Sequence, residues 1–166
     1  MLVNLGNIFT RDDTEKTLNA EYDFSHDNLS YDAVFTQPVI SNLHLKKEDR
    51  DIRINLSVKA VADCTCARCL RSFKKDFEFS RDFILTPAIM NDPDIEIPVD
   101  SNKVLDARLY TMQELRLEIP TVLLCEEDCK GLCPVCGRPL RENCGCKIRK
   151  RVDPRLSVLD DLVFDE

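Results

Sequence analysis

Nine cysteines in two separate stretches of a 166-residue chain limit its possible folds more than any other feature. The first stretch contains Cys64, Cys66 and Cys69, and the second has six cysteines within the 22 residues 125–146. The amino-terminal residues lack the basic and apolar regions of a secretory signal, and no run has the length of a transmembrane helix, so we expect a cytoplasmic protein with reduced thiols. Reduced cysteines in this number are more often metal ligands than disulfide partners. Free buried cysteine explains one or two of them, but not the dense second stretch.

The centre of the second stretch, GLCPVCG, has the spacing of a zinc knuckle. A C-x-x-C turn lets two sulfurs reach one ion at about 2.3 Å in tetrahedral geometry. The glycine that follows, here Gly137, permits the positive φ that such turns often need. Two more cysteines lie in a nearby loop and can complete the site. The predicted four-thiolate site consists of Cys133, Cys136, Cys144 and Cys146.

A second C-x-x-C turn, from Cys66 to Cys69, needs two more thiolates, and Cys125 and Cys129 are the pair that remains. A site made of these four would close a long loop, where a cross-link removes much unfolded-state entropy. Spacing alone leaves open whether Cys64 replaces Cys66, because alternate residues of a strand share a face; we expect Cys64 to be a small buried hydrophobe. We therefore predict two zinc ions per chain, with iron and a redox-sensing zinc site as the alternatives.

Residues typical of catalytic sites are scarce in this chain. Catalytic zinc sites keep an open position and usually include histidine or carboxylate ligands. The two histidines, His26 and His44, lie far in sequence from both cysteine stretches. The sequence also lacks a P-loop, a dinucleotide-binding glycine motif, a G-x-S-x-G motif and the zinc deaminase pattern. We therefore predict closed structural sites, no enzymatic activity and no small-molecule substrate.

Hydrophobic periodicity predicts antiparallel strands in the first half of the chain. Apolar and polar residues alternate over 39–45 and 52–62, with a charged turn between them, which is typical of a half-buried hairpin. Residues 73–85 alternate in the same way, so the first cysteine stretch lies at a strand–turn–strand junction. Residues 1–30 predict an edge strand followed by a loop. The proline-rich residues 86–103 predict a loop with a short extended piece.

The apolar spacing changes to three and four in the second half of the chain, which predicts an amphipathic helix that Pro120 ends. The apolar positions of this helix are Leu105, Leu109, Met112, Leu115 and Ile119. A short terminal helix is predicted over 153–162, where an Asp-Pro pair provides the N-cap and the first helical residue.

The expected fold is α+β, with an antiparallel β-sheet or meander, a packed helix and a carboxy-terminal zinc-ribbon-like cysteine cluster. Residues 1–124 are expected to form the sheet and helix core. Residues 125–166 are expected to form the cysteine-rich zinc-binding segment and the terminal helix, packed on the core as one domain.

The charge of the chain excludes a simple basic coat for nucleic acid, because 23 basic and 30 acidic side chains give a formal charge of −7. Six basic residues are nevertheless concentrated beside the second cysteine stretch. They are Arg138, Arg141, Lys147, Arg149, Lys150 and Arg151. These residues either compensate the nearby thiolates or form a local RNA-binding patch, and the sequence leaves both open.

Several of these segments occur together, in the same order, in one bacterial family. They are CARCL at 66–70, LEIP at 117–120, CEEDCKGLCPVCG at 125–137, NCGC at 143–146 and DPRLSVLDDL at 153–162. The chain closely resembles the YceD family of large ribosomal RNA subunit accumulation proteins from about residue 30 to 164. The resemblance, and neither composition nor spacing, implies a role in the synthesis, processing or stability of large-subunit ribosomal RNA.

Together, the residues and the resemblance predict a non-enzymatic ribosome biogenesis factor with structural zinc sites. Its basic edge would contact large-subunit ribosomal RNA, and its acidic body would suit a basic ribosomal protein as partner. The alternatives are an acidic adaptor or chaperone for a basic ribosomal protein, and a redox-sensing zinc protein. We expect no membrane association.

Overall fold

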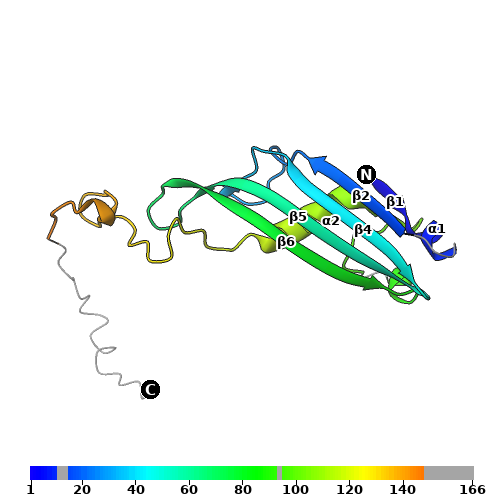
Figure 1. Ribbon diagram of the computed structural model, residues 1–166. Coiled ribbons are helices and arrows are strands. Elements are labelled where there is room, and N and C mark those ends of the chain that lie inside the picture. Colours follow the sequence, from blue (N-terminus) through cyan, green and yellow to red (C-terminus); the bar gives the residue numbers. More distant parts are fainter. Residues whose placement is uncertain (11–14, 93–94, 148–166) are drawn as a thin grey trace, which may run out of the picture.

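A five-stranded antiparallel sheet forms the body of the computed structural model, which describes residues 1–10, 15–92 and 95–147 (Figure 1). Its strands are β2 (Glu15–Tyr22), β3 (Ala33–Val34), β4 (Val39–Glu48), β5 (Asp51–Thr65) and β6 (Ser72–Leu85). β4 pairs with β2 and with the first part of β5, and β3 pairs with the end of β5. β6 pairs with β5 along its whole length.

Strand β5 shows why these residues form a sheet with one buried face. Its even-numbered side chains, from Ile52 to Cys64, are buried, and its odd-numbered side chains are exposed or half-buried. Successive side chains of a strand point to opposite faces, so this alternation places the apolar residues in the core and the polar ones in water. The predicted hairpin and the predicted third strand are confirmed.

Helix α2 (Ala107–Glu118) lies across the buried face of the sheet (Figure 1). The Asp106 carboxylate accepts hydrogen bonds from the backbone N–H groups of Arg108 and Leu109, which satisfies the free donors of the first turn. The helix therefore begins two residues later than predicted, because Leu105 belongs to strand β7 (Val104–Asp106). The predicted end of the helix, before Pro120, is confirmed.

The buried face of α2 agrees with the prediction at Leu115 and differs from it at Leu109. Leu109 is 36% exposed, whereas Tyr110 and Thr111 are buried. The Thr111 hydroxyl shares a buried 2.8 Å hydrogen bond with the Ser41 hydroxyl of β4, so both polar groups are satisfied inside the core. Periodicity counted on aliphatic residues identified Leu115 but missed Tyr110 and Thr111, because tyrosine and threonine are not aliphatic.

The first thirty residues contain more regular structure than the predicted edge strand and loop. Strand β1 (Leu2–Asn4) pairs with β7 in a separate two-stranded sheet, and helix α1 (Leu5–Thr10) follows directly. Strand β2 buries only Leu18 and Tyr22, so its apolar alternation is too weak to detect in the sequence. Within the described residues of the expected loop over 86–103 lies a short 3-10 helix, η1 (Ile89–Asn91).

The cysteine-rich segment begins at the end of the sheet where β5 turns into β6 (Figure 1). It contains a second short 3-10 helix, η2 (Leu140–Glu142). The predicted α+β fold, with its sheet, packed helix and cysteine clusters, is confirmed. The predicted helix over 153–162 lies outside the described residues. None of the helices in the described part of the chain is long and apolar enough to cross a membrane.

Candidate metal centres

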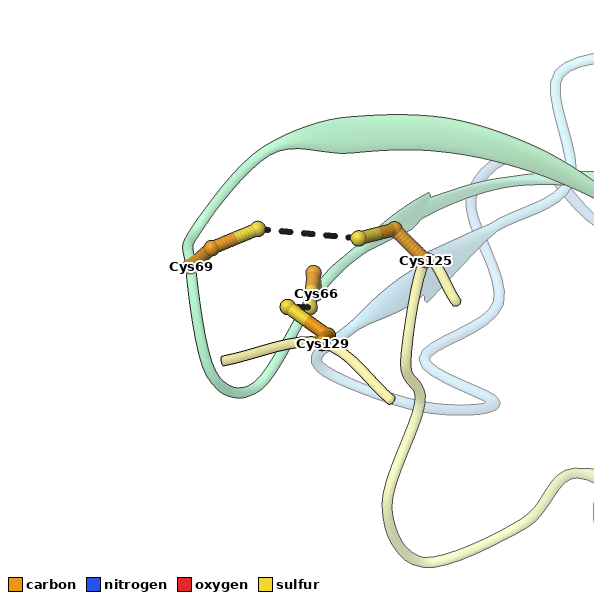
Figure 2. Close-up of side chains that lie close together, drawn as sticks. All are labelled: Cys66, Cys69, Cys125 and Cys129. Carbon is orange, nitrogen blue, oxygen red and sulfur yellow. Dashed lines mark hydrogen bonds between the residues drawn. The ribbon is translucent and has the colours of Figure 1, made fainter. Parts of the chain in front are cut away.

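Four cysteine side chains from two distant segments meet at the β5–β6 turn (Figure 2). This first cysteine group consists of Cys66, Cys69, Cys125 and Cys129, whose Sγ atoms lie within 4.8 Å of one another. Cys66 Sγ is 3.7 Å from Cys129 Sγ, and Cys69 Sγ is 3.6 Å from Cys125 Sγ. Four sulfurs bound tetrahedrally to one zinc-sized ion would lie about 3.8 Å apart. The group therefore has the dimensions of a metal site.

Hydrogen bonds connect the two segments of the first cysteine group. The Ala67 N–H donates to the Leu123 carbonyl at 2.8 Å, and Arg68 Nη1 donates to the Cys129 carbonyl at 2.9 Å. Gly131 has a φ of +76°, and a Cβ on it would lie 3.1 Å from the Arg68 carbonyl oxygen. The fold therefore positions these cysteines, and glycine is needed where the second segment passes the turn.

The second cysteine group is local in sequence. It consists of Cys133, Cys136, Cys144 and Cys146, whose Sγ atoms also lie within 4.8 Å of one another. Cys133 is buried, whereas Cys136 is exposed and the remaining two are half-buried. Asn143 and Gly145 have left-handed backbone conformations, with φ of 47° and 69°, on either side of Cys144. These two residues curve the C-x-C loop away from an extended strand.

The two C-x-x-C turns share one backbone geometry. In each, the first cysteine's N–H donates to the carbonyl five residues later, and its own carbonyl accepts from the N–H four residues later. These two distances are both 2.9 Å at Cys66, and 2.7 and 2.8 Å at Cys133. The residue after the second cysteine is left-handed in both turns, with φ of 58° at Leu70 and 72° at Gly137. The positive φ predicted for Gly137 is confirmed. The same conformation at Leu70 was not predicted, because residues with a side chain seldom adopt it.

The thiols within each group differ in how readily they ionise. Burial raises the pKa of Cys66, but hydrogen bonds from neighbouring backbone N–H groups outweigh it and lower this pKa to about 6. Backbone N–H groups in its own turn lower the pKa of Cys133 to about 7. The pKa rises to about 12 at Cys125, first through burial, and at Cys146, first through neighbouring thiols. The leading cysteine of each turn is therefore prepared to act as a thiolate ligand.

Cys64 belongs to the hydrophobic core and to neither cysteine group. It is 1% exposed and lies between Ala33 of β3 and Phe73 of β6 in the sheet. Burial raises the pKa of its thiol, as expected for a neutral side chain among apolar neighbours. The expectation that Cys64 is a small buried hydrophobe is confirmed, and Cys66 is the residue that faces the other three sulfurs.

A cavity of about 340 Å³ lies between the first cysteine group and residues 139–143, which connect the two halves of the second group. The lining residues on the first side include Cys69, Cys125 and Cys129, and those on the second side include Leu140 and Arg141. The Leu140 N–H donates to the Gly131 carbonyl at 2.9 Å, and Arg141 Nη1 lies 4.0 Å from Glu126 Oε1. A backbone hydrogen bond and an ion pair therefore connect residues 140–141 of the second group's loop to the segment that follows Cys125.

Three of the six basic residues predicted to contact RNA lie within the described part of the chain. Arg138, Arg141 and Lys147 are exposed beside the second cysteine group. The remaining residues, Arg149, Lys150 and Arg151, lie outside it. Because Arg141 already faces Glu126, part of its charge is compensated within the protein. RNA binding by these residues stays a prediction, as does metal binding by the eight cysteines.

Comparison with known proteins connects this geometry to a family. Residues 54–163, which include all nine cysteines, match the family described as Large ribosomal RNA subunit accumulation protein YceD. Uncharacterized proteins of Mycobacterium bovis and Mycobacterium tuberculosis are each 25% identical to the chain over 131 residues. This similarity covers 75% of the chain and 62% of each relative, so the chain spans less than two thirds of their length. No solved structure matches the chain.

Proposed function

This chain belongs to the YceD family of large ribosomal RNA subunit accumulation proteins, and from that premise we propose a non-enzymatic ribosome biogenesis factor. It supports the synthesis, processing or stability of large-subunit ribosomal RNA in the cytoplasm. The observation that carries the proposal is the family match, which runs through β5, β6, α2 and both cysteine groups.

Two zinc ions, one in each cysteine group, are part of the proposal. The ligands are Cys66, Cys69, Cys125 and Cys129 for the first ion, and Cys133, Cys136, Cys144 and Cys146 for the second. Sulfur spacing, the shared turn geometry and four cysteines in each group support closed, structural sites. Zinc is preferred to iron because the second group combines one C-x-x-C turn with a C-x-C loop, whereas rubredoxin-type iron sites usually pair two such turns.

The RNA contact is assigned to the basic edge beside the second cysteine group. This edge comprises Arg138, Arg141, Lys147, Arg149, Lys150 and Arg151. Lysine and arginine neutralise backbone phosphates, whereas the acidic remainder of the chain repels them, so RNA binding is confined to this edge. The acidic body then suits a basic ribosomal protein. The sheet and helix part (1–124) and the cysteine-rich part (125–166) act as one domain, because the first zinc ion joins them.

Gel-shift titration with large-subunit RNA fragments tests the RNA contact. The triple charge reversal of Arg149, Lys150 and Arg151 to Glu should weaken binding and make it less sensitive to salt, by about one unit of log–log slope for each phosphate no longer neutralised. A matched control reverses the same amount of charge at Lys16, Arg50 and Lys74, which are exposed on the sheet part. Equal affinities of the two triple variants would contradict the assigned edge. Nuclease-resistant capture of a basic ribosomal protein by such variants would support the adaptor instead.

A further inference from the structure

Arg71, two residues after Cys69, is fixed against the first cysteine group. Its carbonyl accepts the Cys66 N–H at 2.9 Å, and its Nη2 donates to Glu126 Oε1 at 2.9 Å. Its Nε atom is buried and has no hydrogen-bond partner within the part of the chain that the structure describes. A buried guanidinium N–H without an acceptor costs free energy, so its position needs a physical reason.

The sulfur of Cys125 lies beside this guanidinium, which also pairs with Glu126. Glu126 directly follows Cys125, so one short segment supplies both the carboxylate that orients the guanidinium and the sulfur that it faces. A neutral thiol accepts hydrogen bonds weakly, whereas a metal-bound thiolate carries negative charge and accepts them strongly.

We propose that Arg71 is a positioning residue of the first metal site, whose Nε–H donates to the Cys125 sulfur once an ion is bound. Its positive charge offsets part of the formal charge of about −2 that four thiolates and one zinc ion carry. Glu126 holds the guanidinium in place, as outer carboxylates commonly do for the groups around a bound metal. This inference rests on the proposed zinc ion in the first cysteine group and is independent of RNA binding.

The chain contains two natural controls for Arg71. Arg138 occupies the same position after the second C-x-x-C turn, but its side chain is exposed. Arg68 lies within the first turn and donates to the carbonyl of Cys129 rather than to a sulfur. A role that depends on a sulfur contact should therefore be confined to Arg71, whereas a general need for positive charge near the thiolates would extend to all three arginines.

The test compares full-length Arg71→Gln, Arg71→Lys, Arg68→Gln and Arg138→Gln, loaded with zinc and titrated with a chelator while native mass spectrometry counts the bound ions. Arg71→Gln should weaken one of the two ions about 10- to 100-fold, the usual effect of removing an outer partner of a metal ligand. Arg71→Lys should weaken it less, because the ammonium keeps the charge but not the fixed Nε–H. The Arg138→Gln variant should match the parent protein, and Arg68→Gln, which loses only a contact with the Cys129 carbonyl, should weaken the ion less than Arg71→Gln does.

A spectroscopic readout separates a sulfur contact from a loss of folding. With cobalt in place of zinc, the thiolate-to-metal absorption should shift in Arg71→Gln and remain unchanged in Arg138→Gln. The same measurements on Arg71→Lys serve if Arg71→Gln does not fold. Unchanged affinity and absorption in the Arg71 variants, or equal weakening in Arg68→Gln, would overturn the role of Arg71 alone. A parent protein that binds no zinc would overturn the metal sites themselves.

Discussion

The two cysteine groups place the same C-x-x-C turn in different structural settings. The first group joins the β5–β6 turn to the segment after α2, and its Cys69 and Cys125 are 56 residues apart in sequence. Three of its four cysteines are buried, whereas one of the four in the second group is. A cross-link over a long loop restricts the unfolded chain far more than a local one. We infer that the first site stabilises the fold and that the second shapes a surface.

Removing one ligand from each group should produce the largest difference. Cys69→Ser should lower the free energy of unfolding by about 4 kcal/mol, the entropy expected for a cross-link across a loop of this length. Cys136→Ser should leave the unfolding of the sheet and helix nearly unchanged, because its loop is local. Denaturant titration of the zinc-loaded variants, followed by far-ultraviolet circular dichroism, measures both. Equal destabilisation of the two variants would show that the groups do not differ in this way.

Metal removal should follow the order of exposure. A chelator should take the ion of the second group first, because Cys136 is exposed and the cysteines of the first group are mostly buried. Lowering the pH should produce the same order, since protons compete with the metal for the thiolates. Native mass spectrometry during either titration should detect an intermediate with one zinc ion. Simultaneous release of both ions would indicate that the two sites act as one unit.

Alanine substitution at two glycines should give intermediate effects. Gly131→Ala, beside the first cysteine group, should lower the free energy of unfolding by about 2 kcal/mol. Left-handed strain there adds to a close contact with the rigid Arg68 carbonyl. Gly137→Ala should cost about 1 kcal/mol, because a Cβ there meets nothing within 4 Å and only the strain remains. Thermal denaturation of the zinc-loaded proteins compares them. A larger destabilisation at Gly137 would contradict this ranking.

Leu70→Gly should have the smallest effect. Leu70 has the same left-handed conformation as Gly137, and its side chain is 66% exposed, so the substitution removes little buried surface. Glycine relieves the backbone strain but adds freedom to the unfolded chain, and the two effects should cancel to within about 0.5 kcal/mol. The free energy of unfolding, measured with urea, checks this. A decrease above about 1.5 kcal/mol would imply that Leu70 packs more tightly than its exposure indicates.

The strands and the grouping of the cysteines could be predicted from the sequence because both depend on local spacing. The alternation in β5 follows from the geometry of a strand, and the C-x-x-C turn follows from the reach of two sulfurs to one ion. Once the four cysteines of the second group are assigned to one ion, Cys125 and Cys129 remain as the partners of Cys66 and Cys69. Spacing left open whether Cys64 or Cys66 completes the first group, and the structure answers it by burying Cys64 on the core face of β5.

The features that the sequence did not reveal depend on tertiary contacts. Thr111 is buried in α2 because Ser41 supplies a hydrogen-bond partner from another strand. Strand β2 is stabilised by pairing with β4 rather than by its own apolar pattern. The orientation of Arg71 depends on Glu126, whose position is set by the return of the chain after α2. No pattern in a single stretch of sequence contains these pairings.

Counting the zinc ions bound to the purified protein tests the account most directly. Native mass spectrometry and elemental analysis should find two zinc ions per chain, one ion in Cys136→Ser with its fold intact, and a strongly destabilised fold in Cys69→Ser. A parent protein with a single ion, or a Cys136→Ser variant that still binds two ions, would contradict two inequivalent four-cysteine sites, and iron in place of zinc would contradict the choice of metal.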